Sequence, residues 1–195
     1  GTTEAAWASA FVALSAAELI HRGESSAFAL CRPPGHHASK NQFGGYCFLN
    51  NAAIAAQKML HDGAQKIAIL DVDFHHGNGT QDIFYQRNDV FYCSIHGDPM
   101  EAFPYFLGFS DEIGTGLGVD YNLNLPLQRG ATFHIWHQAL NHALRKIRQF
   151  TPDVLVISLG VDTFENDPIS FFKLKSKDFT QMGKTIASMN LPTLF

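Results

Sequence analysis

Charged side chains are scarce in this sequence, and none of them gather into a basic stretch. Asp, Glu, Lys and Arg make up 16% of the 195 residues, and the formal net charge is −4 at pH 7. Proteins that bind nucleic acid neutralise its phosphates with clustered Lys and Arg side chains. The composition therefore argues against nucleic acid as a partner.

Long hydrophobic runs and cysteines are also missing or rare. No apolar stretch approaches the roughly 20 residues that a membrane-spanning helix needs, and residues 1–7 lack the basic start of a signal peptide. Cys31, Cys47 and Cys93 are an odd number without the paired spacing of a metal-binding finger. We therefore expect buried thiols rather than a disulfide framework, in a cytoplasmic protein that does not bind membranes.

Helix-like and strand-like segments alternate along the chain, whose 46% hydrophobic content is enough for one domain with a large core. Apolar residues recur at helical spacing in 4–21, 51–61, 79–85, 132–149 and 177–189. Short apolar runs typical of buried strands occur at 27–31, 66–74, 90–95, 121–125, 154–159 and from 191 onwards. This alternation predicts an α/β fold with right-handed crossovers.

Ligand-binding loops of such folds follow the carboxyl ends of the strands. Two long irregular segments, 32–48 and 96–118, are rich in Gly, Pro and His, and both follow expected strands. The Gly-rich stretch 114–118 precedes a strand instead of opening a helix, so we reject a phosphate-binding loop there. The site is expected where the two long segments meet.

The strongest chemical signal is the run DVDFH at 71–75, at the end of an expected strand. Because side chains alternate along a strand, Asp71, Asp73 and His75 should share one face. Uncompensated buried charges are costly, and a bound cation is the simplest compensation. The alternative is a solvated strand end with a hydrogen-bonded histidine, which the preceding hydrophobic run disfavours.

A second strand, expected at 154–159, leads to Asp162, which can join Asp73 and His75 at the same edge of the sheet. Two carboxylates and one imidazole suit a catalytic zinc ion, which keeps a fourth position open for water or substrate. Taken alone, Asp162 is weak support, since Asp is common in turns after strands. As the partner of the first motif it completes a three-ligand site.

Adjacent histidines, His36 and His37, follow two prolines in the first long segment. Such pairs are often surface or structural residues. Beside a metal site, one histidine could act as general base and acid while the other stays charged. The run NQFGGY at 41–46 and Phe103 add aromatic rings that either line a cleft or only pack the loops.

The motifs RPPGHHA, GGYCFLNN, DVDFHHGNGT and GVDTFENDP, in this order and spacing, resemble those of the zinc-dependent histone deacetylase superfamily. The likeness is greatest to class II-like bacterial members and acetylpolyamine amidohydrolases, and it covers essentially the whole chain. It implies the arginase/deacetylase-like fold, an open, mostly parallel sheet sandwiched by helices. It also implies zinc-dependent hydrolysis of N-acetyl amides to acetate and a free amine, with acetylpolyamines the favoured substrates and acetyl-lysine proteins the alternative.

The resemblance assigns ion ligands residue by residue. It implies that Asp73, His75 and Asp162 bind Zn²⁺. It further implies a structural K⁺ held by Asp71, by the region of Ser94 and by backbone oxygens of Asp73 and His75.

Catalytic and substrate-binding roles follow in the same way. His37 would be the general base and acid, and His36, paired to Asp71, its electrostatic partner. Asn78 stands where class I members have an Asp, which favours the class II-like branch and leaves the charge on His37 open. Residues implied to hold the substrate chain and its amide are Gly45, Tyr46 and Phe103.

The resemblance also predicts that 1–195 is part of a single deacetylase catalytic domain. The opening strand of the family would precede Gly1, and its transition-state tyrosine would follow in a Gly-Gly-Tyr motif beyond Phe195. Because losing one oxyanion donor costs on the order of 100 to 1,000-fold in turnover, we expect a weak or inactive chain. A non-catalytic module that binds metal and an acetylated amine is therefore an alternative.

Individual residues bear on two further questions, the number of metal ions and the choice of substrate. An arginase-like site with two manganese ions needs more bridging carboxylates, but Gly77, Thr163 and Phe164 occupy the neighbouring positions, so one metal fits better. Substrate choice depends on the rim of the cleft, where Glu101, Asp111 and Glu112 either select polyamines or are merely solvated. Family members commonly build that rim through dimer contacts, so a homodimer is an expected assembly.

Overall fold

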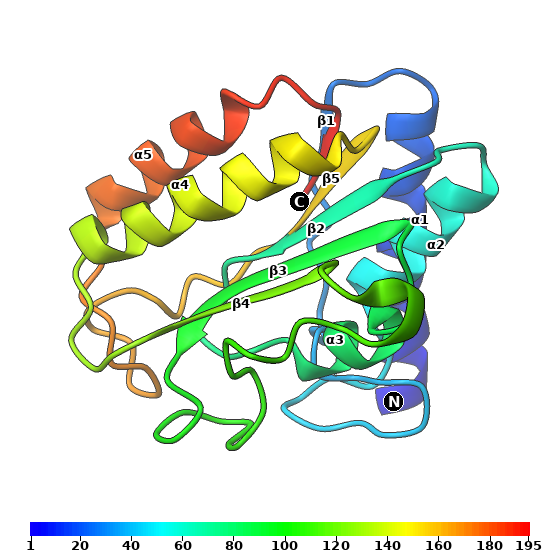
Figure 1. Ribbon diagram of the computed structural model, residues 1–195. Helices are drawn as coiled ribbons and strands as arrows, with labels where there is room; N and C mark the ends of the chain where they lie inside the picture. Colours follow the sequence, from blue (N-terminus) through cyan, green and yellow to red (C-terminus); the bar gives the residue numbers. More distant parts are fainter.

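A single six-stranded sheet with helices on both faces organises the protein in the computed structural model, which describes all residues 1–195 (Figure 1). The elements in chain order are α1 (Thr2–His21), β1 (Ser26–Ala27), α2 (Asn51–His61), β2 (Ile67–Asp71), α3 (Asn78–Phe84), β3 (Val90–Gly97), the short 3-10 helix η1 (Gly116–Gly118), β4 (Asn122–Leu127), α4 (Phe133–Phe150), β5 (Val154–Ser158), α5 (Ser176–Ala187) and β6 (Thr193–Leu194).

The strand order is β1-β6-β5-β2-β3-β4, and every neighbouring pair is parallel. β2 lies between β5 and β3, and Ile67 is in register with both Val154 and Val90. Parallel strands end at the same edge of a sheet, so the segments that follow β2, β3 and β5 lie together. The α/β fold expected from the alternating pattern is confirmed.

The core consists of two hydrophobic layers, one on each face of the sheet. Helices α4 and α5 cover one face, and α1, α2 and α3 lie on the other (Figure 1). In β2, Ala68 and Leu70 join the α4 layer, whereas Ile67 and Ile69 join the α1 and α2 layer. All five residues of β2 are buried, which explains why this strand reads as a continuous apolar run rather than an alternating one.

Two expected strands are shorter than the sequence suggested. Of the run 27–31 only Ala27 lies in a strand, β1, which pairs Ser26 and Ala27 with Thr193 and Leu194 of β6, and Leu30 is largely exposed. The run 66–74 ends as a strand at Asp71. Beyond it the chain bends, since the Asp71 carboxylate accepts the backbone N–H of Asp73 and the Asp73 carboxylate accepts that of His75.

The structure contains no helix with the length and hydrophobicity that crossing a membrane requires.

Candidate metal centre and catalytic cleft

Three side chains from two neighbouring strand ends meet in one cluster. Asp73 and His75 follow β2, Asp162 follows β5, and one ligand atom of each lies within 4.8 Å of the others. The backbone N–H of Phe74 donates to Asp162 Oδ1 at 2.9 Å, which ties the two strand ends together. His75 Nδ1 lies 2.8 Å from Asp162 Oδ2 and 3.2 Å from Asp73 Oδ1.

Asp71 points elsewhere, contrary to the expectation of one shared face. Its side chain is fully buried, and it accepts hydrogen bonds from His36 Nδ1 at 3.0 Å and from the Tyr92 hydroxyl at 3.3 Å. The alternation argument fails here because β2 ends at Asp71, so the strand period does not extend to Asp73 and His75. Asp71 instead lies in register with Ser94 on β3, whose side chain is also fully buried.

The electrostatics of the cluster suit a bound cation. Burial, with the nearby Asp73 carboxylate, raises the pKa of Asp162 to about 6. Burial alone would lower the pKa of His75, but the two carboxylates raise it to about 9. Both shifts reflect partly buried negative charges that need a positive partner, and two oxygens and one imidazole nitrogen are good ligands for a divalent metal ion.

Close packing around the cluster requires glycine next to Asp73. A Cβ atom at Gly160 would lie 2.1 Å from Asp73 Oδ2, which no side chain can tolerate without displacing that carboxylate. β5 ends at Ser158, and Gly160 follows after one further residue, Leu159. The sequence motif contains this glycine, and the structure supplies its reason.

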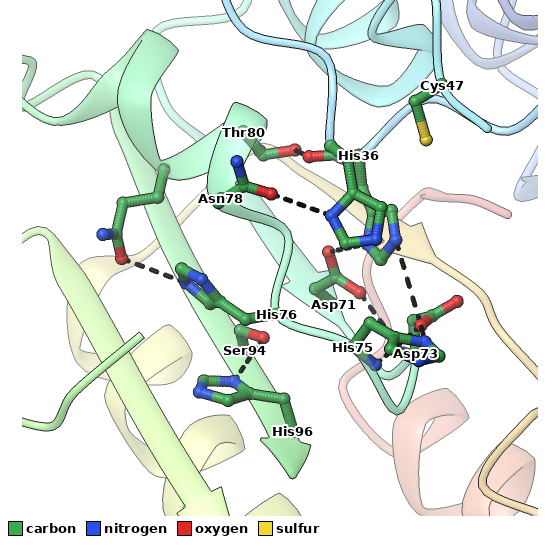
Figure 2. Close-up of polar contacts among 12 residues, drawn as sticks. His36, Cys47, Asp71, Asp73, His75, His76, Asn78, Thr80, Ser94 and His96 are labelled. Carbon is green, nitrogen blue, oxygen red and sulfur yellow. Dashed lines mark hydrogen bonds and ion pairs between the residues drawn. The ribbon is translucent and has the colours of Figure 1, made fainter. Parts of the chain in front are cut away.

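The two adjacent histidines have different partners and different charges. Burial alone would lower the pKa of His36, but the carboxylates of Asp71 and Asp73 raise it to about 9 (Figure 2). Burial and the nearby His36 charge lower the pKa of His37 to about 3. His37 Nδ1 donates to Asn78 Oδ1 at 2.8 Å, so the neutral ring keeps Nε2 free to accept a proton.

A cleft of about 670 Å³ connects these groups. The Asp73, His75 and Asp162 cluster lines it with His36 and His37. The residues expected to hold substrate, Gly45, Tyr46 and Phe103, line it as well. The Phe103 ring stands nearly perpendicular to the His37 ring at a centroid distance of 4.9 Å. Gly45 packs so closely that a Cβ atom would lie 2.2 Å from His37 Cδ2, and Tyr46 is largely exposed at the mouth.

The rim of the cleft differs from the acidic rim considered from the sequence. Glu101 lines the cleft, where Arg129 Nε donates to its Oε2 at 2.8 Å, and the Arg129 guanidinium lies 4.4 Å from the centre of the Phe171 ring. Asp111 is exposed and outside the cleft, whereas Glu112 binds backbone N–H groups of its own loop.

Arg129 and the segment 168–171 are cleft residues that the sequence did not reveal. Arg129 lies two residues after β4, and the segment begins ten residues after β5. Apart from Pro168, the last residue of the GVDTFENDP motif, no motif marks them. Only the parallel order of the strands brings them to this edge of the sheet.

The parallel sheet and the Asp73, His75 and Asp162 cluster at its carboxyl edge agree with the family that the sequence motifs resemble. The family model for the histone deacetylase domain matches residues 1–194. The chain belongs to this family.

Curated relatives of the chain include proteins named acetylpolyamine amidohydrolases. The chain is similar to an acetylpolyamine amidohydrolase of Mycoplana ramosa, at 59% identity over 194 residues, covering 100% of the chain and 57% of that protein. It is 58% identical to acetylpolyamine amidohydrolase 1 of Pseudomonas aeruginosa, over 100% of the chain and 56% of that protein. The chain thus spans little more than half the length of the curated relatives it matches.

A solved structure agrees with this comparison. The acetylpolyamine aminohydrolase from Burkholderia pseudomallei superimposes with a TM-score of 0.93 at 47% sequence identity, covering 95% of the chain and 54% of that structure. The arginase/deacetylase-like fold expected from the resemblance is confirmed.

Proposed function

We propose that the protein hydrolyses acetylated small amines, acetylpolyamines above all, to acetate and the free amine. The observation that carries this proposal is that the Asp73, His75 and Asp162 cluster and the neutral His37 open into the same cleft. Relatives at 56–59% identity that are named acetylpolyamine amidohydrolases support the choice of substrate.

The three clustered side chains would hold Zn²⁺. When bound, zinc supplies a Lewis acid for the acetyl carbonyl and for the attacking water. We assign a structural K⁺ to Asp71 and Ser94, which lie side by side in register on β2 and β3, with backbone oxygens of Asp73 and His75. Removing such buried carboxylates from water is costly, and a cation offsets that cost.

His37 would move the proton. Its Nε2 is free to take a proton from water as the water attacks the acetyl carbon, and the same nitrogen then gives that proton to the leaving amine. Asn78 holds the ring through Nδ1. His36, charged through its pairing with Asp71, would stabilise negative charge that develops on the acetyl oxygen.

The walls of the cleft would hold the acetylated arm of the substrate. Phe103 and Tyr46 offer aromatic surface for a methylene chain, and Gly45 lies against the His37 ring, where a side chain would clash. The amide N–H of the substrate would donate to the backbone at Gly45. These roles follow from the resemblance, and the common cleft supports them.

The proposal also covers the domain, the cellular compartment and the assembly of the protein. We propose that residues 1–195 work within one catalytic domain, since a single sheet links them. The three free cysteines suit a reducing compartment such as the cytoplasm. A homodimer would complete the rim of the cleft.

The decisive experiment strips the protein with a chelator, reloads it with zinc, and measures both equilibrium binding and acetate release. We expect N-acetylputrescine to bind only in the zinc-loaded state, and acetate release to be slow and to depend on zinc in the same way. D162N should abolish zinc binding, whereas D167N, in the same segment but outside the cluster, should not.

Other outcomes select the alternatives. Faster acetate release from an acetyl-lysine peptide than from N-acetylputrescine would identify a protein deacetylase. Binding without release at any metal loading would identify a non-catalytic module. If the zinc-loaded protein binds no acetylated amine, the proposal is wrong.

A further inference from the structure

Glu112 is the centre of a hydrogen-bond cluster on the side of β4 and α3, outside the cleft. Both of its carboxylate oxygens accept the backbone N–H of Gly108 at 3.0 Å, and Oε1 also accepts that of Phe109 at 3.1 Å. The Gln81 side-chain N–H donates to the same carboxylate. One carboxylate thus fixes the backbone of a loop that has no helix or strand of its own.

A layer of amides fixes Glu112 in turn. Gln81 Oε1 accepts from His76 Nε2 at 3.1 Å and from the Nδ2 groups of Asn122 and Asn124 at 2.9 and 2.8 Å. These four side chains are buried and come from three different segments of the chain. Because Gln81 has its oxygen occupied by donors, only its N–H₂ group can face Glu112, and an acceptor is required there.

The loop also rests directly on two histidine rings. His96 Nε2 donates to the Gly108 carbonyl at 2.9 Å, and the rings of His76 and His96 lie 4.6 Å apart (Figure 2). A Cβ atom at Gly108 would lie 2.7 Å from His76 Cγ and 2.7 Å from His96 Nε2, and the residue has a φ of +103°. Gly108 can therefore approach the rings only as glycine, and Glu112 holds it there.

The fixed end of this loop continues into the wall of the cleft. Phe106 N–H donates to the Pro99 carbonyl at 2.9 Å, and Tyr105 N–H donates to the Ala102 carbonyl at 3.0 Å, so 99–106 form one compact turn. Asp98 N–H ties the start of the turn to the Leu127 carbonyl of β4. Phe103, which packs on His37, lies at the tip of this turn.

We propose that Glu112 is a positioning residue that holds Phe103 against His37 by fixing the turn at Gly108. The inference rests on the proposed function, because Phe103 matters only if the cleft binds an acetylated amine. It assigns a structural role to Glu112, for which the sequence suggested only a rim charge or a solvated side chain.

Asp111 provides a matched control. It is the neighbouring acidic residue, it is exposed, and its side chain is outside both the cleft and the Glu112 hydrogen bonds. E112Q and D111N remove the same charge one position apart. In E112Q the new N–H₂ group faces the donors of Gly108, Phe109 and Gln81, so at least one of these hydrogen bonds is lost.

The first measurement is amide hydrogen exchange, which does not depend on catalysis. E112Q should exchange faster than the wild-type protein in 102–109, whereas D111N should not, and helix α4 should be unchanged in both. Unchanged exchange of 102–109 in E112Q would overturn the proposal. Faster exchange throughout the protein would mean a general loss of stability and would equally count against it.

The second measurement is the dissociation constant of the zinc-loaded protein for N-acetylputrescine. We expect E112Q to weaken binding about threefold to tenfold, since hydrogen bonds to a charged group are lost but the cleft residues remain. E112D, which keeps the carboxylate, should recover part of this affinity. D111N should bind like the wild-type protein.

A double-mutant cycle tests whether Glu112 affects substrate binding through Phe103. If Glu112 acts through Phe103, E112Q should change binding less than about twofold in an F103A background, because coupled residues are not additive. Equal weakening in both backgrounds would overturn the proposal. If the wild-type protein itself binds no N-acetylputrescine, the proposed function fails, and the exchange measurement still tests the contact between Glu112 and the loop.

Discussion

Each carboxylate oxygen of Asp73 has a close neighbour in the cluster of Asp73, His75 and Asp162. Its Oδ1 accepts the His75 backbone N–H at 2.8 Å, and its Oδ2 faces the bare Cα of Gly160. Burial alone would raise the pKa of Asp73, but the charged His36 and the bonds from His75 hold it below its ordinary value. The carboxylate is thus ionised and aimed before any metal arrives.

We predict that G160A weakens zinc binding about tenfold or more, in the range seen when groups that orient metal ligands are changed. The added methyl group would lie 2.1 Å from Asp73 Oδ2 and must displace it. G183A is the control, because a Cβ atom at this exposed position of α5 meets nothing within 4 Å. Zinc titration against a competing chelator measures both variants. Equal affinities for the two would contradict this explanation.

Among the helices, α4 packs most extensively on β2 and β3. Its buried residues Trp136, Leu140, Ala143, Leu144 and Ile147 recur every three or four positions and form one apolar stripe. The stripe packs on the face of the sheet that contains Leu70 and Cys93, one residue before Asp71 and Ser94. The helix therefore supports the strand ends that carry the site.

L140A should lower the free energy of unfolding by about 2–5 kcal/mol, since it removes a fully buried side chain and leaves a cavity. I135A, one helix position away from Trp136 but 46% exposed, should cost less than about 1 kcal/mol. Urea unfolding followed by circular dichroism gives both values. A similar loss in the two variants would mean that α4 does not pack on the sheet as described.

The whole molecule buries several titratable groups with few charged partners, and its stability should therefore depend on pH. His96 is fully buried between Ser94 and the Gly108 carbonyl. Burial lowers its pKa from 6.5 to about 4 in the folded protein. Burial also lowers the pKa of His76 well below its ordinary value.

Between pH 6.5 and 4 the unfolded chain binds a proton at His96 and the folded protein does not, so acid favours unfolding. The contribution of His96 should be complete above pH 6.5 and should fall by about 1.4 kcal/mol per pH unit through this window. Urea unfolding of metal-free protein at a series of pH values measures the slope. H96Q should flatten it, whereas H134Q, at an exposed position of α4, should leave it unchanged. An unchanged slope in H96Q would refute the assignment.

The spacing of apolar and acidic residues along the sequence was enough to predict much of this fold and its site. Helical periodicity placed α2 at its observed bounds and α1, α4 and α5 within two residues of theirs, because one buried face repeats along each helix. The order of strands and helices predicted the α/β sheet, and acidic residues after two apolar runs predicted that Asp73, His75 and Asp162 would meet.

Only the tertiary structure decided the rest, because it depends on contacts between distant segments. Strand pairing determined that β1 has two residues and that β2 ends at Asp71, which turns that carboxylate toward His36. The parallel order brought Arg129 into the cleft. Glu112 faces inward because Gln81 lies there, and no spacing along the chain encodes the position of a hydrogen-bond partner 31 residues away.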